Sequence, residues 1–465
     1  MNIRKEYDVV GPMDIPSSAY YGIHSLRAKD NFNITGLPLH PRFIKNIVLI
    51  KKAAAFTNFQ CGDLTKSQYV AIDKACNFII DGNLYDQFIV DMLQGGAGTS
   101  SNMNANEVIA NKAIELLGGN KGDYSIIHPN DHVNMCQSTN DVIPTAGKIT
   151  IIELITNLVD SLQRLNIALL DKSAEFHHII KMGRTQMQDA VPMRLGQSFE
   201  AYAHAIERDI KCLNLQKEFI NEVNLGGTAI GNSINANSEY LENIVSNLSD
   251  ICGINLRSSL DKFDATSNLD TLVRVSGAIK SCAVSLSKMC NDLRLISSGP
   301  TTGIGEINLP PRQNGSSIMP GKVNPVIPEV INQIAYQIIG NDTTVTIAAE
   351  SGQLELNAFE PVIFKNIFES AEYLTNGVNT LIENCIIGIT ANQKRCHELV
   401  TNSYSMATIL SPVIGYNKAS QIAKEAQMTG KSVRQLVKNN GLDVVFDKIL
   451  KDTFSSEEVL TIYSV

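Results

Sequence analysis

Two adjacent serines, a lysine and an asparagine stand in one short segment rich in glycine and proline. The segment GSSIMPGKVNP, Gly315–Pro325, carries Ser316, Ser317, Lys322 and Asn324 and contains no aspartate, histidine or cysteine. Glycine and proline are typical of loops. We therefore predict a mobile loop that brings hydroxyl, amide and ammonium groups to a ligand.

Three further segments have the same small, polar, mostly uncharged character: QGGAGTSSNMNANE (Gln94–Glu107), HPNDHVNMCQSTND (His128–Asp141) and GRTQMQDAVP (Gly183–Pro192). Taken singly, such residues are often helix caps, and Thr139 could simply begin a helix with Pro144 in its first turn. Four such segments in one chain favour a pocket of neutral hydrogen-bond donors with one or two cations. That composition suits a small dianion with two carboxylates.

Other chemistries have weaker signals. GGAGTS lacks the GK[ST] ending and a preceding strand, so a nucleotide-binding loop is not expected. His128 and His132 lack the glutamate of HExxH and are interrupted by Pro129, so we predict no metal site. The nine cysteines are scattered, odd in number and without a CxxC, which favours reduced, mostly buried thiols in the cytoplasm.

The bulk composition is that of a large folded protein. Of 465 residues, 44% are hydrophobic and 18% are charged, which gives ample material for a core. The net charge of −8 argues against a nucleic-acid partner. No stretch of about 18 apolar residues and no signal peptide is found, so we expect no membrane span and a cytoplasmic location.

Long helical patterns dominate the middle of the chain. Apolar residues recur at spacings of three and four from Ile149 onward, and again over Leu272–Leu293, Val326–Ile347 and Phe359–Ile386. Strand patterns are sparse. The chain is predicted to be mainly α, with a bundle of long helices in which each helix buries an apolar stripe against its neighbours.

Three domains are predicted: a mixed N-terminal domain (1–140), a central helical bundle (141–395) and a small helical C-terminal domain (396–465). The long helices carry Ile, Leu, Ala and Val on more than one face. We therefore expect subunits to associate through the bundle.

The polar segments together closely resemble the signature sequences of the aspartase/fumarase superfamily, in order and over essentially the whole chain. The resemblance implies a mixed N-terminal domain, a long-helix bundle and a small helical C-terminal domain. It also implies a homotetramer in which each active site is built from loops of three subunits.

The resemblance further implies a reversible elimination of an amine or hydroxide from a succinyl compound, giving fumarate. Ser316 matches the general base, with Ser317 as the alternative base. Backbone N–H groups of the loop and nearby Lys322 are plausible stabilisers of its alkoxide. Lys322 and Asn324 match the residues that hold one substrate carboxylate. The residues that match those holding the other carboxylate are Thr99, Ser138, Thr139 and Ser317.

Two features place the chain on the aspartase side of the superfamily. YYGIHSLRAKDNF resembles the aspartase form of the N-terminal segment, where fumarases have tryptophan and glutamine. Gln186 stands where fumarases have a histidine that pairs with the glutamate matching Glu329. A leaving hydroxide needs a proton donor, whereas ammonia can leave without one and needs only orientation by Thr185, Gln186 and Asn140.

The expected reaction is therefore conversion of L-aspartate to fumarate and ammonia, and the alternative is a fumarate hydratase. A catalytically silent scaffold is a second alternative, of a different class. The reaction requires no metal or organic cofactor, and activation by a divalent cation stays open. The roles of Glu329 and Arg27 stay open too: Arg27 could assist carboxylate binding or be structural.

Overall fold

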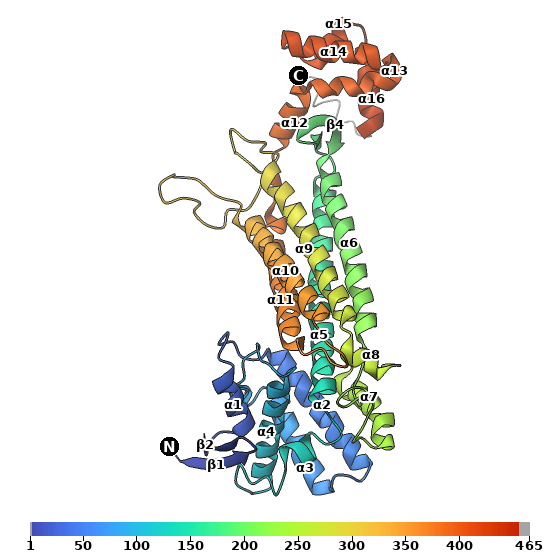
Figure 1. The fold of residues 1–465 in the computed structure, drawn as a ribbon. Coiled ribbons are helices and arrows are strands. Elements are labelled where there is room, and N and C mark those ends of the chain that lie inside the picture. The colour runs from blue at the N-terminus through green and yellow to red at the C-terminus, as the bar shows by residue number, and fades with distance from the viewer. Residues whose placement is uncertain (1, 455–465) are drawn as a thin grey trace. The chain divides into compact units, whose positions relative to one another are not determined.

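The computed structural model describes residues 2–454, and helices account for most of them, so the prediction of a mainly α chain is confirmed (Figure 1). The five longest helices are α5 (Thr139–Glu175), α6 (Leu195–Ile220), α9 (Asp270–Ile296), α10 (Val326–Glu350) and α11 (Glu360–Asn384). Four of these five were expected from their apolar periodicity.

Helix α6 was missed in the sequence, although its buried residues have the spacing of a helix face. Phe199, Ala203, Ile206 and Leu213 are each at most 1% exposed. Charged and polar residues lie between these positions and obscure the pattern. Helix α5 is long and apolar enough to cross a membrane, but most of it is buried within the protein, as is typical of a core helix.

The chain forms two compact units, and each of the five long helices has residues in both. The first unit comprises the described residues up to Val159 with Lys211–Ser281 and Tyr336–Leu374. The second comprises Asp160–Ile210, Cys282–Ala335 and the described residues from Thr375 onward. The three-domain division from the sequence stays a prediction.

The first unit contains the shorter helices that precede and follow α5. Thr65 caps α3 through a reciprocal capping box with Gln68, and Asn237 caps α7. The rings of Phe43, Phe364 and Phe368 pack together in its core. Its further elements are β1 (Ile3–Asp8), β2 (Gly11–Pro16), α1 (Ile23–Asn31), α2 (Pro41–Gln60), α3 (Lys66–Ile80), α4 (Thr99–Leu116), β5 (Glu222–Val223), α7 (Ser238–Cys252), β6 (Arg257–Ser258) and α8 (Lys262–Ser267).

The second unit joins the remaining parts of the long helices to a hairpin and a group of C-terminal helices. Buried apolar residues of that hairpin and of the C-terminal helices form one cluster, which includes Met182, Leu410 and Phe446. Its further elements are β3 (Ile180–Thr185), β4 (Gln188–Arg194), β7 (Ile307–Asn308), β8 (Thr390–Ala391), α12 (Gln393–Asn402), α13 (Ser411–Ile414), α14 (Tyr416–Thr429), α15 (Val433–Asn439) and α16 (Asp443–Phe454). All sheets in the described residues have two strands.

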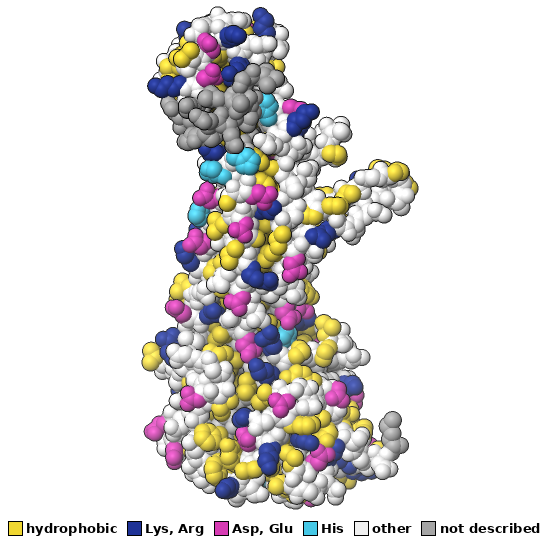
Figure 2. Space-filling view, turned by 180° about the vertical axis from the view of Figure 1, so that it is seen from behind, with side chains coloured by type: hydrophobic (Ala, Val, Ile, Leu, Met, Phe, Trp, Pro, Cys, Tyr) yellow, Lys and Arg dark blue, Asp and Glu magenta, His cyan; other side chains and the backbone are white. Residues whose placement is uncertain are grey.

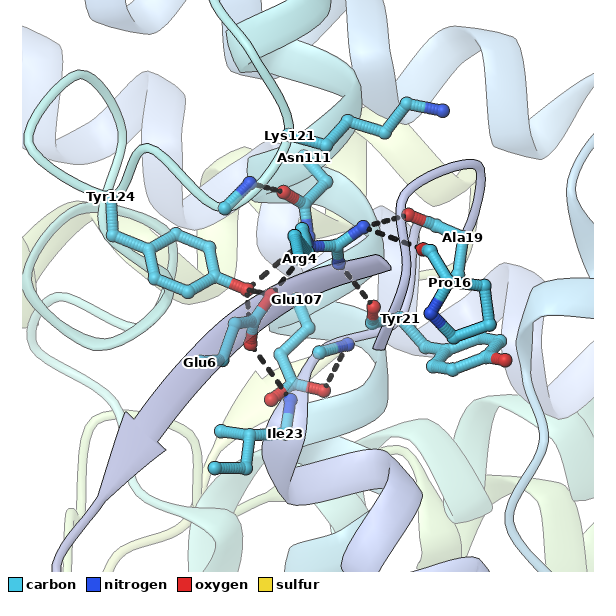
Figure 3. A network of polar contacts seen from close by, with 12 residues as sticks. Arg4, Glu6, Pro16, Ala19, Tyr21, Ile23, Glu107, Asn111, Lys121 and Tyr124 are labelled. Carbon is cyan, nitrogen blue, oxygen red and sulfur yellow. Dashed lines mark hydrogen bonds and ion pairs between the residues drawn. The ribbon is translucent and has the colours of Figure 1, made fainter. Parts of the chain in front are cut away.

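A buried polar network fixes the N-terminal hairpin of the first unit against α4 (Figure 3). The guanidinium of Arg4 donates to Glu6 and to three backbone carbonyls. The Glu107 carboxylate, on α4, accepts N–H bonds from Gly22, His24 and Ser25 at the start of α1. A carboxylate at this position satisfies free N–H groups of a helix N-terminus and complements its dipole.

Stability should depend on pH through Glu107. Burial raises the pKa of this carboxyl from 4.5 to about 7, against the opposing effect of its N–H donors. The folded state then binds the proton more tightly than the unfolded chain, so this group's stabilisation is complete below about pH 4.5 and is lost as the pH rises through about 7. Over that range the loss should be roughly 3 kcal/mol.

The measurement is the urea midpoint of unfolding between pH 4.5 and pH 7 for the wild type and for Glu107→Gln. The glutamine variant cannot titrate and should be less stable throughout, because its amide N–H₂ faces N–H donors. The difference in free energy of unfolding between the variant and the wild type should become smaller as the pH rises, because only the wild type loses stability. Parallel curves for the two proteins would contradict the assignment of this titration to Glu107.

Candidate active site

In the first unit, the predicted site residues lie around two helix N-termini. Thr99 is the first residue of α4, and Thr139 is the first residue of α5. The Asn102 side chain, one turn into α4, donates a 3.3 Å hydrogen bond to Thr139 Oγ1. The structure therefore joins the beginnings of both helices, where free backbone N–H groups and the helix dipole favour an anion.

An open cleft of about 690 Å³ lies at this place. Ser138 and Thr139 line it together with Asn102, and residues Thr228–Ile230 form another part of its wall. Thr99 and Asn140 do not line the cleft. Asn140 instead donates its side-chain N–H to Ala229 O at 2.7 Å, and Thr99 Oγ1 donates to Gly96 O at 2.7 Å.

A buried cation lies beneath this cleft, and sequence reasoning missed it. Lys51 on α2 is fully buried, and its Nζ donates to Asn134 Oδ1 at 2.8 Å and to Gln137 Oε1 at 2.9 Å. Burial lowers the pKa of Lys51 to about 7. The available signal was a pair of lysines, Lys51 and Lys52, within an otherwise apolar helical stretch, VLIKKAAAF.

Asp141 is a second buried charge that shapes the cleft. Its carboxylate accepts N–H bonds from Ser138, Gly226 and Thr228 at 2.9–3.1 Å. Burial raises its pKa to about 7, and these hydrogen bonds oppose that shift. Asp141 thus ties the Ser138 segment to the loop at Gly226–Thr228 and fixes the shape of the cleft.

In the second unit, Thr185 and Gln186 lie at the tip of the β3–β4 hairpin. Thr185 pairs with Gln188, so Gln186 and Met187 form a two-residue turn, and both have positive φ, at 50° and 65°. Such values fit the twist of a hairpin but are strained for residues other than glycine. Both predicted side chains are exposed.

The Gly315–Pro325 segment forms a loop in this unit, as predicted, and the loop closes on itself at its base. Gly315 N–H donates to Lys322 O at 2.7 Å, and Asn324 Nδ2 donates to Gly315 O at 3.0 Å. A Cβ at Gly315 would lie 2.7 Å from Lys322 O, so only glycine fits here. Figures 1 and 2 show this part of the chain projecting from its helices, and Ile318 in it is 84% exposed.

Within the loop, Ser316 is the serine that receives backbone donors. Its Oγ accepts N–H bonds from Ile318 at 3.2 Å and from Met319 at 3.1 Å. Two fixed N–H dipoles aimed at one oxygen stabilise negative charge on that oxygen. Ser317 has no such arrangement among the described residues, so the geometry favours Ser316 as the base.

Lys322 and Asn324 line a cavity of about 570 Å³ in the second unit, together with Arg294. Lys322 is exposed, and its ammonium group makes no ion pair with any residue that the structure describes. An unpaired lysine, and an asparagine whose side-chain amide has a second N–H to donate, are suited to an anionic ligand. The structure thus groups Lys322, Asn324 and Ser316 in one unit, and Ser138 and Thr139 in the other.

Two residues of undecided role can now be placed. Arg27 makes a two-point ion pair with Asp8, at 2.7 and 2.9 Å, which favours its structural interpretation. Glu329 lies in the first turn of α10 and makes no hydrogen bond or ion pair with another described side chain. It is half-buried.

His128 has a structural contact of its own, and the predicted lack of a metal site stays a prediction. His128 Nδ1 accepts N–H bonds from Asn130 and Asp131 and so caps a short helical turn. No group of three or more His, Cys, Asp or Glu side chains in the described part of the chain could hold a metal ion. All nine cysteines are free thiols.

Comparisons with known proteins show which family the chain belongs to. Residues 11–340 match the family model described as Lyase, and residues 406–453 match the model of the fumarase C C-terminus. Aspartate ammonia-lyases from Pseudomonas canavaninivorans and Helicobacter pylori are each 50% identical, over 97% and 99% of this chain and 96% and 98% of theirs. A crystal structure of fumarate lyase:delta crystallin from Brucella melitensis bound to cobalt superposes with a TM-score of 0.94, at 50% identity over 96% of this chain and 98% of that one.

The family model and the full-length relatives show that the chain is an enzyme of the lyase class. The chain belongs to the aspartase/fumarase superfamily, because a lyase family model covers most of it and half of its residues are identical to those of full-length relatives. This confirms the resemblance found in the sequence.

Proposed function

We propose that the protein is an aspartate ammonia-lyase, which converts L-aspartate to fumarate and ammonia and catalyses the reverse addition. The single observation that carries the chemistry is the pair of backbone N–H groups on Ser316 Oγ. The choice of ammonia as leaving group is supported by the relatives and by Gln186, which has no titratable proton to give to a hydroxide.

In the proposed mechanism the Ser316 alkoxide removes a proton from Cβ of aspartate. The electron pair delocalises into the adjacent carboxylate, which becomes an enediolate with two negative charges. The hydroxyls of Ser138, Thr139 and Ser317 hold this group together with the N-termini of α5 and of α4, where Thr99 is the first residue. Fixed donors are most effective where charge develops. Lys322 and Asn324 hold the other carboxylate.

Collapse of the enediolate forms the double bond and expels ammonia from Cα. Thr185, Gln186 and Asn140 orient the departing nitrogen by hydrogen bonds. The products are fumarate and ammonia, and the proton stays on Ser316 until it passes to solvent. No resident metal or organic cofactor takes part in this proposal, and a divalent cation would act only as an activator.

The assembly we propose is a homotetramer in which three subunits contribute loops to each active site, in the cytoplasm. Exposed apolar side chains on the long helices support association: Ile167, Val284, Ile339 and Ile347 are each at least 41% exposed in the single chain. Apolar surface of this kind is usually covered by another protein surface. Analytical ultracentrifugation should show a tetramer and no stable monomer.

The test is fumarate formation, followed by ultraviolet absorbance, with L-aspartate and L-malate in parallel. Product from aspartate alone is expected, with kcat/KM at least about 10³-fold above that for malate, because a leaving hydroxide lacks its proton donor. Product from malate at a comparable rate would contradict the use of Gln186 as discriminator. Absence of product from either substrate would favour a catalytically silent scaffold.

A further inference from the structure

A fully buried carboxylate in the second unit, Glu306, lies outside the predicted site and has two cationic partners. Arg184 Nη1 lies 2.8 Å from its Oε1, and Lys181 Nζ lies 3.1 Å from its Oε2. Glu306 is 0% exposed and Lys181 is 6% exposed. Removing one partner of a buried ion pair is costly, so these contacts hold their residues firmly in place.

Both cations come from strand β3, although their spacing should place them on opposite faces. Residues three apart in a regular strand point to opposite sides. The pairing with β4 shifts register between Met182 and Arg184, because the single residue Gly183 lies opposite two residues of β4. This bulge in β4 makes the hairpin irregular here, and the side chains of Lys181 and Arg184 both reach the same carboxylate. A Cβ at Gly183 would lie 2.8 Å from Val191 O, which explains the glycine.

Glu306 is itself fixed by its backbone. Its N–H donates to Ile296 O at 2.8 Å, and its carbonyl accepts from Asn392 N–H at 2.9 Å and from Cys396 Sγ at 3.5 Å. Arg395 on α12 also donates to the carbonyls of Ile304 and Gly303 just before it. Glu306 thus joins the end of α9, the start of α12 and the segment that leads to the Ser316 loop.

The tip of the β3–β4 hairpin depends on a fixed contact of this kind to hold its position. Arg184 directly precedes Thr185 and the strained turn at Gln186 and Met187. The side chains of Thr185 and Gln186 make no hydrogen bond with any residue of the described chain. Their position therefore depends on the strands that carry them, and the Arg184–Glu306 ion pair is the side-chain contact closest to them in sequence.

We propose that Glu306 is a positioning residue that sets amine selectivity by holding the hairpin tip, through Arg184, at the place where the nitrogen leaves or attacks. This inference rests on the proposed function. A fixed tip leaves room for ammonia and aligns it, whereas a loose tip aligns ammonia less well and admits larger amines.

The experiment is the reverse reaction of fumarate with ammonia, methylamine and hydroxylamine, using wild type and Glu306→Gln. We expect kcat with ammonia to fall about tenfold, and the preference for ammonia over the two larger nucleophiles to fall about fivefold or more. KM for fumarate should change less than about twofold, because Lys322 and the helix N-termini bind it.

Two further variants keep the outcome decisive. Arg184→Lys keeps the charge but shortens the reach, so it should fold and reproduce the loss of selectivity even if Glu306→Gln does not fold. Lys181→Met is the matched control: it removes the other partner of Glu306, three residues further from Thr185, and should leave selectivity unchanged.

Equal loss with all three amines in Glu306→Gln and Arg184→Lys, or the same loss of selectivity in Lys181→Met, would overturn the proposal. Failure of the proposed function is distinguishable, because the wild type would then form no aspartate from fumarate and ammonia.

Discussion

Ser316→Ala is expected to lower kcat for fumarate formation from L-aspartate by about 10³-fold or more. The reason is the loss of the oxygen that takes the Cβ proton, at the one position where Ile318 and Met319 direct their N–H groups onto a serine hydroxyl. The measurement is steady-state kinetics with active-site titration by a non-reacting dicarboxylate. The variant should still bind that ligand.

Loss of activity in the alanine variant could also come from a changed loop, because Ser316 Oγ is the acceptor that holds the turn to Met319. Ser316→Asn separates the two effects. An asparagine side chain accepts the same N–H bonds two and three residues on, as in an Asx turn, but cannot act as the base. It should be as inactive as alanine, and restored turnover would show that the serine is structural.

Ser317→Ala is the second comparison, because Ser317 is the alternative base. Its hydroxyl is exposed and receives no N–H bond from the described residues. We expect kcat/KM to fall by about tenfold, because the enediolate loses one hydrogen bond. The effect on kcat should be smaller than in Ser316→Ala. A larger loss than in Ser316→Ala would reverse the assignment.

The sequence was sufficient to predict the elements that carry local patterns. Three- and four-residue apolar spacing located α9, α10 and α11 to within a few residues, and it located the middle of α5. Glycine, proline and serine located the loop at Gly315–Pro325. Helix α6 was missed because its polar face is broad, so the apolar spacing is visible only once Phe199 and Leu213 are known to be buried.

The contacts that support the site could not be predicted, because they join residues far apart in the chain. Lys51 meets Asn134 across 83 positions, and Arg184 meets Glu306 across 122. No local sequence pattern predicts a contact between residues so far apart in the chain. The polar loops can be recognised because their residues are unusual for a helical protein, whereas Glu306 stands in an ordinary segment and the irregular β3–β4 pairing beside Arg184 has no local signal.

Lys322→Met is expected to lower kcat/KM for L-aspartate by about 10²–10³-fold, equivalent to about 3–4 kcal/mol. Lys322 is an exposed ammonium without an ion-pair partner in the described chain, on the same loop as the base and next to Asn324. Its charge is therefore free to bind a carboxylate and to keep the substrate close to Ser316. Loss of the charge should raise KM and lower kcat, since a poorly held substrate is also poorly aligned.

Lys394→Met is the matched control, because Lys394 is an exposed lysine of α12 outside the predicted site. It loses the same charge from the same unit and should keep wild-type kinetics. Lys322→Arg should recover only part of the loss, since a planar guanidinium does not replace a compact ammonium at a fixed distance. A change of less than about threefold in Lys322→Met would assign the carboxylate to another cation, and Arg294 in the same cavity would be the first to test.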